Sequence, residues 1–110
     1  MTSHPLDALI AAPDHHTVLF ENERVRILDT RVHPGDQTPV HAHEWPAALY
    51  VLGTSEFLRR DSEGVILADS RDRPPLAHGQ ALWIEPLPPH SVENIGSAEL
   101  HIIAIEVKQS

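Results

Sequence analysis

The chain has 110 residues, enough for one domain with a modest core. Sixteen acidic residues against eight basic ones give a formal net charge of -8, which argues against nucleic acid or an acidic membrane surface as a partner. The chain has no cysteine, so disulfides, thiolate metal ligands and cysteine nucleophiles are all excluded. The N-terminus has neither a basic region nor a long apolar run, so we expect no signal peptide, no membrane span and a cytoplasmic protein.

The chain begins with an apolar stretch, residues 6–12, that ends at Pro13. A helix of that length does not hold by itself, so we expect an N-terminal arm over residues 1–17. Beyond it, short apolar runs alternate with turns rich in glycine, proline, asparagine and aspartate, which is typical of strands. The strands we expect span residues 17–20, 25–32, 40–43, 47–52, 56–60, 65–69, 80–84, 90–95 and 99–108. So many short strands without helices between them favour an all-β sandwich or barrel, which we place over residues 18–108.

Two histidines separated by one residue, His41 and His43, follow a turn at Gly35. Alternate residues of a strand point to the same face, so the two imidazoles lie together and supply half of a metal site. A third candidate ligand is His90, far downstream. The alternative is a metal-free polar cavity in which these rings hydrogen-bond to their neighbours. We expect surface positions for histidines that lack such a pattern: His4, His15, His16 and His78.

These two segments resemble the two conserved motifs of the cupin superfamily. The first motif combines a glycine turn, a His-x-His pair, a glutamate and a closing glycine; here the closing glycine is Gly53 or its place is taken by Thr54, while Ala47 and Ala48 stand where the glutamate is expected. The second motif ends on a histidine followed by an asparagine, which His90 and Asn94 match. The resemblance covers roughly residues 18–107 and is greatest to small single-domain cupins with the RmlC-like jelly roll.

The resemblance implies an antiparallel jelly-roll (cupin) barrel, often dimeric, and we expect a homodimer. It also implies that His41, His43 and His90 bind a divalent metal ion, which could be Fe, Mn, Ni or Zn. The missing glutamate then leaves a coordination position open near Ala47, or it indicates that the metal has been abandoned. Besides Ala47, we expect Trp45 and Tyr50 to line a substrate cavity.

The resulting functional hypothesis is a metal-dependent oxygenase or isomerase that acts on a small organic acid or thiol. The alternative is a non-catalytic cupin barrel that binds a small ligand, with or without metal. No dedicated acid–base pair is visible in the motifs, and this favours the alternative. Of the adjacent Arg59 and Arg60, at most one can face a substrate carboxylate, since neighbouring strand residues point to opposite faces, and we expect both at a solvated edge.

Overall fold

The structure of the chain is a computed structural model that describes residues 4–109. Two very short helices, α1 (Ala8–Ala11) and the 3₁₀ helix η1 (Ser70–Asp72), accompany nine strands. The strands are β1 (His16–Glu21), β2 (Val25–Val32), β3 (His41–His43), β4 (Ala47–Gly53), β5 (Phe57–Asp61), β6 (Ile66–Asp69), β7 (Ala81–Ile84), β8 (Leu87–Asn94) and β9 (Leu100–Val107). No helix within residues 4–109 is long and apolar enough to cross a membrane.

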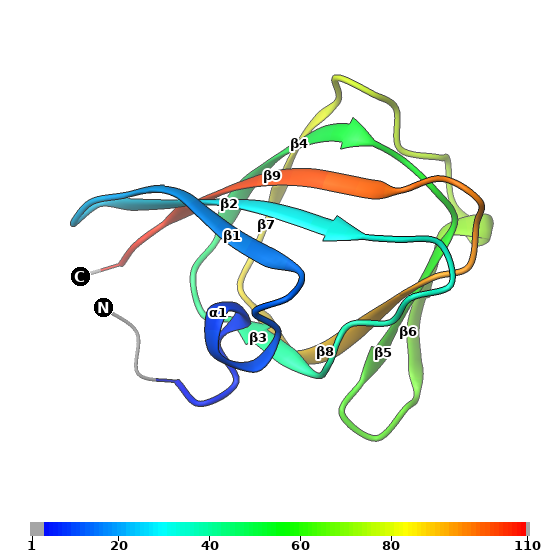
Figure 1. Cartoon of the computed structure of the whole chain (residues 1–110), viewed down its shortest axis with the longest axis horizontal. Coiled ribbons are helices and arrows are strands. Elements are labelled where there is room, and N and C mark those ends of the chain that lie inside the picture. Colours follow the sequence, from blue (N-terminus) through cyan, green and yellow to red (C-terminus); the bar gives the residue numbers. More distant parts are fainter. Residues whose placement is uncertain (1–3, 110) are drawn as a thin grey trace.

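The strands form two facing layers (Figure 1). One is a five-stranded sheet in the order β1-β2-β9-β4-β7, and the other is a four-stranded sheet in the order β3-β8-β5-β6. Every pairing between these strands is antiparallel. The expected all-β class is therefore correct, but the expected closed barrel is not: each sheet keeps two edge strands without a hydrogen-bonded neighbour in the other sheet.

The core lies between the two layers and is built from alternate residues of the central strands. Leu28 and Val32 of β2 are buried, as are Leu100 and Ala104 of β9. Each buried leucine contributes about 1.5–3 kcal/mol of hydrophobic stabilisation. The period-two alternation predicted from the sequence thus holds, and the face of β2 that points inward carries Leu28 and Val32.

The N-terminal arm folds back onto its own chain. Helix α1 lies below β1 and next to β3 (Figure 1). The carbonyl oxygen of Leu6 accepts a hydrogen bond from the backbone N–H of Ala42 at 2.6 Å, and the Asp7 side chain caps α1 by accepting one from the backbone N–H of Leu9 at 3.1 Å. Strand β1 already begins at His16, so the arm is shorter than the 1–17 segment that the sequence suggests.

An isoleucine-rich strand such as β9 would offer a second subunit a good pairing surface if it lay at the edge of its sheet. It lies instead at the centre of its sheet, hydrogen-bonded to β2 on one side and to β4 on the other. Exposed apolar side chains lie on two edge strands: Val18, Leu19 and Phe20 of β1 are 40%, 54% and 52% exposed, and Ile66 and Leu67 of β6 are 54% and 48% exposed. We take β1, which belongs to the larger sheet, as the edge for homodimerisation, with β6 as the alternative.

We predict that the chain is a two-fold dimer in solution and that Phe20→Glu converts it to a monomer, because a buried carboxylate without a partner opposes association. Light scattering at micromolar concentration measures the mass. The matched control is Ile66→Glu, which places the same charge on the exposed edge strand β6. A wild-type monomer contradicts the dimer, and an equal effect of both variants contradicts the assignment to β1.

Candidate metal centre

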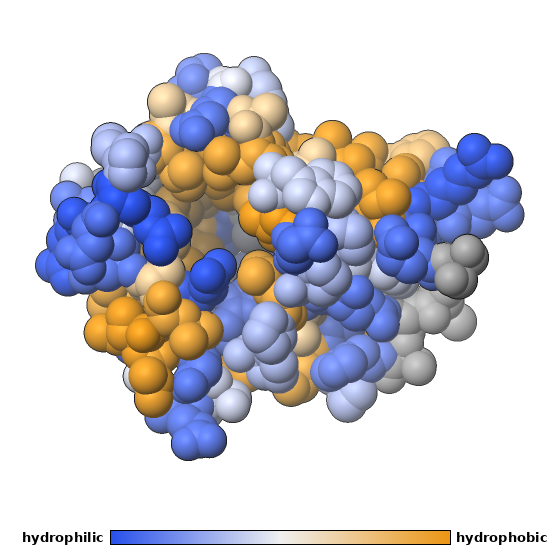
Figure 2. Space-filling view, turned by 180° about the vertical axis from the view of Figure 1, so that it is seen from behind, coloured by the Kyte–Doolittle hydropathy of each residue, from blue (hydrophilic) through white to orange (hydrophobic). Residues whose placement is uncertain are grey.

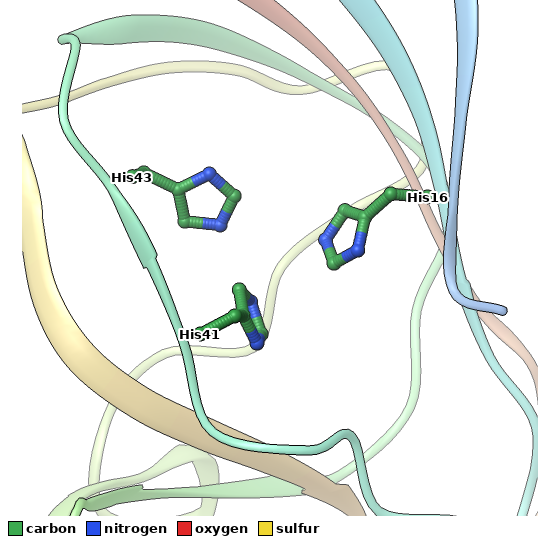
Figure 3. A group of neighbouring side chains, drawn as sticks. All are labelled: His16, His41 and His43. Atoms are coloured by element: carbon green, nitrogen blue, oxygen red, sulfur yellow. The ribbon is translucent and has the colours of Figure 1, made fainter. Parts of the chain in front are cut away.

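Four histidines from three strands meet between the two sheets, and we call them the histidine cluster: His16 of β1, His41 and His43 of β3, and His90 of β8. One ring nitrogen from each of His16, His41 and His43 lies within 4.8 Å of the others, and Figure 3 shows these three rings turned toward a common space. The ring centroid of His90 lies 4.5 Å from that of His41 and 5.5 Å from that of His43. The three rings whose nitrogens could hold one ion are therefore His16, His41 and His43, and the predicted ligand His90 lies beside them without being one of these three.

Every ring of the histidine cluster uses its Nδ1 to reach an acceptor outside the cluster. These acceptors are the carbonyl oxygens of Ala12 for His16 (2.9 Å), Pro39 for His41 (2.9 Å) and Pro88 for His90 (2.8 Å), and the Glu106 carboxylate for His43 (3.2 Å). A carbonyl or an ionised carboxylate can only accept, so Nδ1 carries the proton in each ring. Each neutral imidazole then has its lone pair on Nε2, which makes no hydrogen bond to any described residue. Four Nε2 atoms of this tautomer suit a metal ion.

Burial keeps three of these rings neutral. The side chains of His16, His41 and His90 are almost completely buried, and this burial lowers the pKa of His16 to about 3, that of His41 to about 4 and that of His90 to about 3. The carbonyl hydrogen bonds oppose the shift and the neighbouring histidines add to it. Metal ligation needs deprotonated imidazoles, so these three rings are in the right protonation state at neutral pH.

Three buried charged side chains form a hydrogen-bonded chain that ends at His43. The Glu106 carboxylate of β9 accepts from His43 Nδ1 and, at 2.6 Å, from Nε of Arg26 on β2, and Arg26 also donates to both oxygens of Asp7 at 2.9 and 3.1 Å. All three charged side chains are at most 3% exposed. Burial raises the pKa of Glu106, but the hydrogen bonds from His43 and Arg26 outweigh it and hold that pKa below its usual value. A carboxylate therefore orients a ligand ring and partly offsets the charge of a bound cation.

A cavity of about 170 Å³ opens beside the histidine cluster. Its remaining lining is apolar apart from two threonines, Arg59 and Glu106, and includes Leu49, Ile84, Leu87, Val92, Leu100 and Ile102. The face shown in Figure 2 is hollowed near its centre, with hydrophobic residues around the hollow. The cavity thus offers a largely apolar chamber that ends at the histidine cluster.

The three residues predicted to line the cavity differ in where they lie. Ala47 is 2% exposed and lines it, next to Glu106 on the neighbouring strand. Trp45 is not among the lining residues; its ring packs against the guanidinium of Arg26, 5.1 Å away. Tyr50 is 42% exposed, on the outer face of β4, because it is an odd number of residues from Ala47. The expectation for Trp45 and Tyr50 is therefore wrong.

His16 is the ligand candidate that sequence reasoning missed, since it was assigned to the surface. A signal was present: neighbouring residues of a strand point to opposite faces, so one member of the pair His15–His16 had to face inward if a strand began there. In the structure His16 faces the cavity, and His15 turns to Asp36, which it contacts at 2.8 Å. The sequence alone did not say which of the two would point inward.

Acid should destabilise the metal-free protein. The pKa values of His16, His41 and His90 lie below the unfolded value of about 6.5, so the unfolded chain binds protons first and stability falls as the pH drops from about 6.5 toward 4. Between pH 7.5 and 5.5 we expect a loss of about 1 kcal/mol per histidine. Urea unfolding of chelator-treated protein at both pH values measures it. His90→Gln should reduce the pH dependence, and a free energy of unfolding that does not fall on acidification contradicts the prediction.

Solved structures with a similar fold include several cupins. A cupin domain from Bordetella pertussis Tohama I is 27% identical, with 86% of this chain and 92% of that chain covered and a TM-score of 0.69. The polyketide cyclase RemF from Streptomyces resistomycificus is 21% identical over 90% and 68% of the two chains (TM-score 0.59). An RmlC-like cupin with a double-stranded β-helix fold from Methanocaldococcus jannaschii is 16% identical over 84% and 77% (TM-score 0.59). No protein-family model and no curated protein sequence matched the chain.

These likenesses extend over most of this chain and over most of the cupin from Bordetella. They agree with the two facing antiparallel sheets. At such low sequence identities the similarity indicates a shared fold. It does not indicate that this chain shares the activity of any of these proteins. The fold of the chain is that of the cupin superfamily.

Proposed function

We propose that the chain binds one divalent metal ion at the histidine cluster and uses it in a reaction on a small organic ligand held in the adjoining cavity. The observation that carries this proposal is the group His16, His41 and His43, whose ring nitrogens lie within 4.8 Å of one another while each Nδ1 is hydrogen-bonded to an acceptor outside the group. A merely structural cluster of buried histidines would satisfy its nitrogens with one another or with the backbone.

The donor set favours a borderline metal. Imidazole nitrogens suit Zn, Fe and Ni, and Mn is a weaker candidate because it prefers oxygen donors. Four neutral donors leave the charge of the ion uncompensated except through Glu106, which reaches it only by way of the His43 ring. The proposed fourth protein donor is thus His16 in place of the glutamate that the cupin motif would place near Ala47.

The reaction class we propose is that of an oxygenase or isomerase. A metal ion at such a site supplies Lewis acidity or oxygen binding. The chain's own residues contribute an apolar cavity that excludes water and orients the ligand against the histidines. Within residues 4–109, Glu106 is the one carboxylate that lines this cavity, and Arg26 and His43 already occupy it.

The occupied carboxylate of Glu106 supports a second candidate function, a metal-binding cupin that binds a ligand without converting it. Proton transfer by a side chain needs a group free to take or give a proton at the ligand, and Glu106 is not free. Turnover assays with oxygen and a panel of organic acids and thiols separate the two: consumption of oxygen or isomerisation supports the enzyme, and ligand binding without product supports the binding protein.

The metal proposal is tested with the double variant His41→Ala/His43→Ala. It should lose the bound ion, because two of the four donors are gone and the remaining two do not hold a divalent ion at nanomolar free metal. Mass spectrometry of metal-loaded, desalted protein measures one ion per chain in the wild type and close to none in the variant. The matched control removes two exposed histidines, His33→Ala/His78→Ala. Equal metal content in the variant and the wild type, or none in the wild type, contradicts the proposal.

A further inference from the structure

The cavity at the histidine cluster adjoins a second, larger chamber. This outer chamber has a volume of about 590 Å³ and lies between strands β4, β5 and β7 and the loop that follows η1. The two chambers share Leu49, Phe57, Arg59, Leu76 and Ile84 as lining residues, so these side chains lie between them. Arg59 therefore borders both chambers.

Arg59 is a half-buried cation without a carboxylate partner among the described residues. The chain has eight basic residues, and five of them form ion pairs: Arg26, Arg31, Arg60, Arg71 and Lys108. Of the other three, Arg24 and Arg73 are exposed and can be solvated, and only Arg59 lines the cavity. Burial, reinforced by the charge of Arg73, lowers the pKa of Arg59. A buried cation without a partner is costly, and an anionic ligand relieves that cost.

The outer chamber concentrates positive charge in a chain whose net charge is -8. Three arginines line it, Arg59, Arg71 and Arg73, and Glu56 is the carboxylate among the described lining residues. The Asp69 carboxylate pairs with Arg71 at 2.8 Å. This leaves Arg59 and Arg73 to attract an anion to the entrance of an otherwise apolar space.

We propose that the cavity takes a molecule with an apolar body and one carboxylate, the body lying between the sheets and the carboxylate at Arg59. This inference rests on the proposed function in placing the molecule beside the histidine cluster, since Arg59 is paired with Val92 of β8, two residues from His90 on the same face. This inference narrows the ligand class. The aliphatic cavity lining offers few hydrogen-bond donors or acceptors to a polar ligand body. A highly hydroxylated molecule would therefore lose its hydrogen bonds to water without gaining others from the protein.

The neighbouring Arg60 provides a matched control. It follows Arg59 on β5, so its side chain points to the other face, where its Nη1 donates to Glu93 at 2.7 Å. The experiment measures binding of naphthylacetate and of its neutral isostere naphthylacetamide by titration calorimetry. It uses chelator-treated wild type, Arg59→Gln and Arg60→Gln, all shown to be folded. Removing the metal first prevents the probe's carboxylate from binding to the ion.

The wild type should bind naphthylacetate about 10- to 100-fold more tightly than the amide, as expected for a charge-assisted hydrogen bond to a half-buried guanidinium. Arg59→Gln should remove this preference without weakening binding of the amide, and Arg60→Gln should leave both affinities unchanged. Equal affinities for the two probes in wild type, a preference that persists in Arg59→Gln, or no binding of either probe each overturns the inference. Metal content is measured separately: a carboxylate preference in a protein that never binds metal refutes the proposed function and leaves this ligand class standing.

Discussion

His16→Ala should bind zinc at least about 100-fold more weakly than the wild type. Residues that only support a ligand typically cost 10–100-fold in metal affinity, and His16 presents a donor nitrogen of its own. Its nitrogen lies within 4.8 Å of those of His41 and His43, and its Nδ1 is held by the Ala12 carbonyl. Competition with a chromophoric chelator measures the affinity. The alanine should fold, since it removes an inward ring without leaving a charge behind.

The matched control for this substitution is the neighbour His15→Ala. His15 belongs to the same turn into β1 but contacts Asp36, so its loss should change zinc affinity by less than a few-fold. The compensating variant adds Ala47→Glu to His16→Ala. Ala47 lines the cavity where the cupin motif would place a glutamate, so the added carboxylate should recover part of the lost affinity. Equal zinc affinity in His16→Ala and the wild type would show that His16 is not a ligand.

Arg26→Met should lower the free energy of unfolding of the metal-free protein by about 3–5 kcal/mol, because removing one partner of a buried ion pair leaves uncompensated charge. Arg26 separates two buried carboxylates, Asp7 and Glu106, and donates hydrogen bonds to both. Without it the two carboxylates keep their desolvation cost and repel each other. For a domain of this size the melting temperature should fall by roughly 10–20 °C.

A matched control is Arg31→Met on the same strand. The side chain of Arg31 is 50% exposed and its partners Asp29 and Glu99 are 16% and 31% exposed, so the group left behind can be solvated and this substitution should cost less than about 1 kcal/mol. Neutralising both carboxylates in the Arg26→Met background, with Asp7→Asn and Glu106→Gln, should recover much of the lost stability. Thermal and urea unfolding measure all four proteins. The idea fails if Arg26→Met and Arg31→Met are equally stable.

The strand positions could be predicted because they depend on local alternation and on turn residues. The expected strand over residues 25–32 coincides with β2, and the other eight match within one to three residues at each end. The shared face of His41 and His43 follows from the same period of two, and the resemblance to the cupin motifs added His90. The sequence could therefore predict that these three rings lie close together.

His16, Glu106 and Arg26 join the site through contacts that no local pattern encodes. His16 lies opposite Thr30 in the β1–β2 pairing, and Arg26 lies opposite Glu106 in the β2–β9 pairing, 80 residues apart in sequence. These registers depend on the hydrophobic pattern of whole strands packed into one sheet. A buried arginine also looks like a surface residue in sequence, since it becomes an interior one only when two carboxylates from distant segments surround it.

By itself, then, the sequence determined the all-β class, the strands and the His-x-His face, because side-chain alternation along a strand is a property of adjacent residues. The tertiary structure decided that the sheets remain two layers, that the inward residue is His16 rather than His15, and that Arg59 faces the cavity while Arg60 pairs with Glu93. In each of these cases both choices satisfy the local pattern. The packing of distant strands decides which face of a strand is buried. The hydrophobic free energy that favours this packing comes from the whole core and not from the local residues.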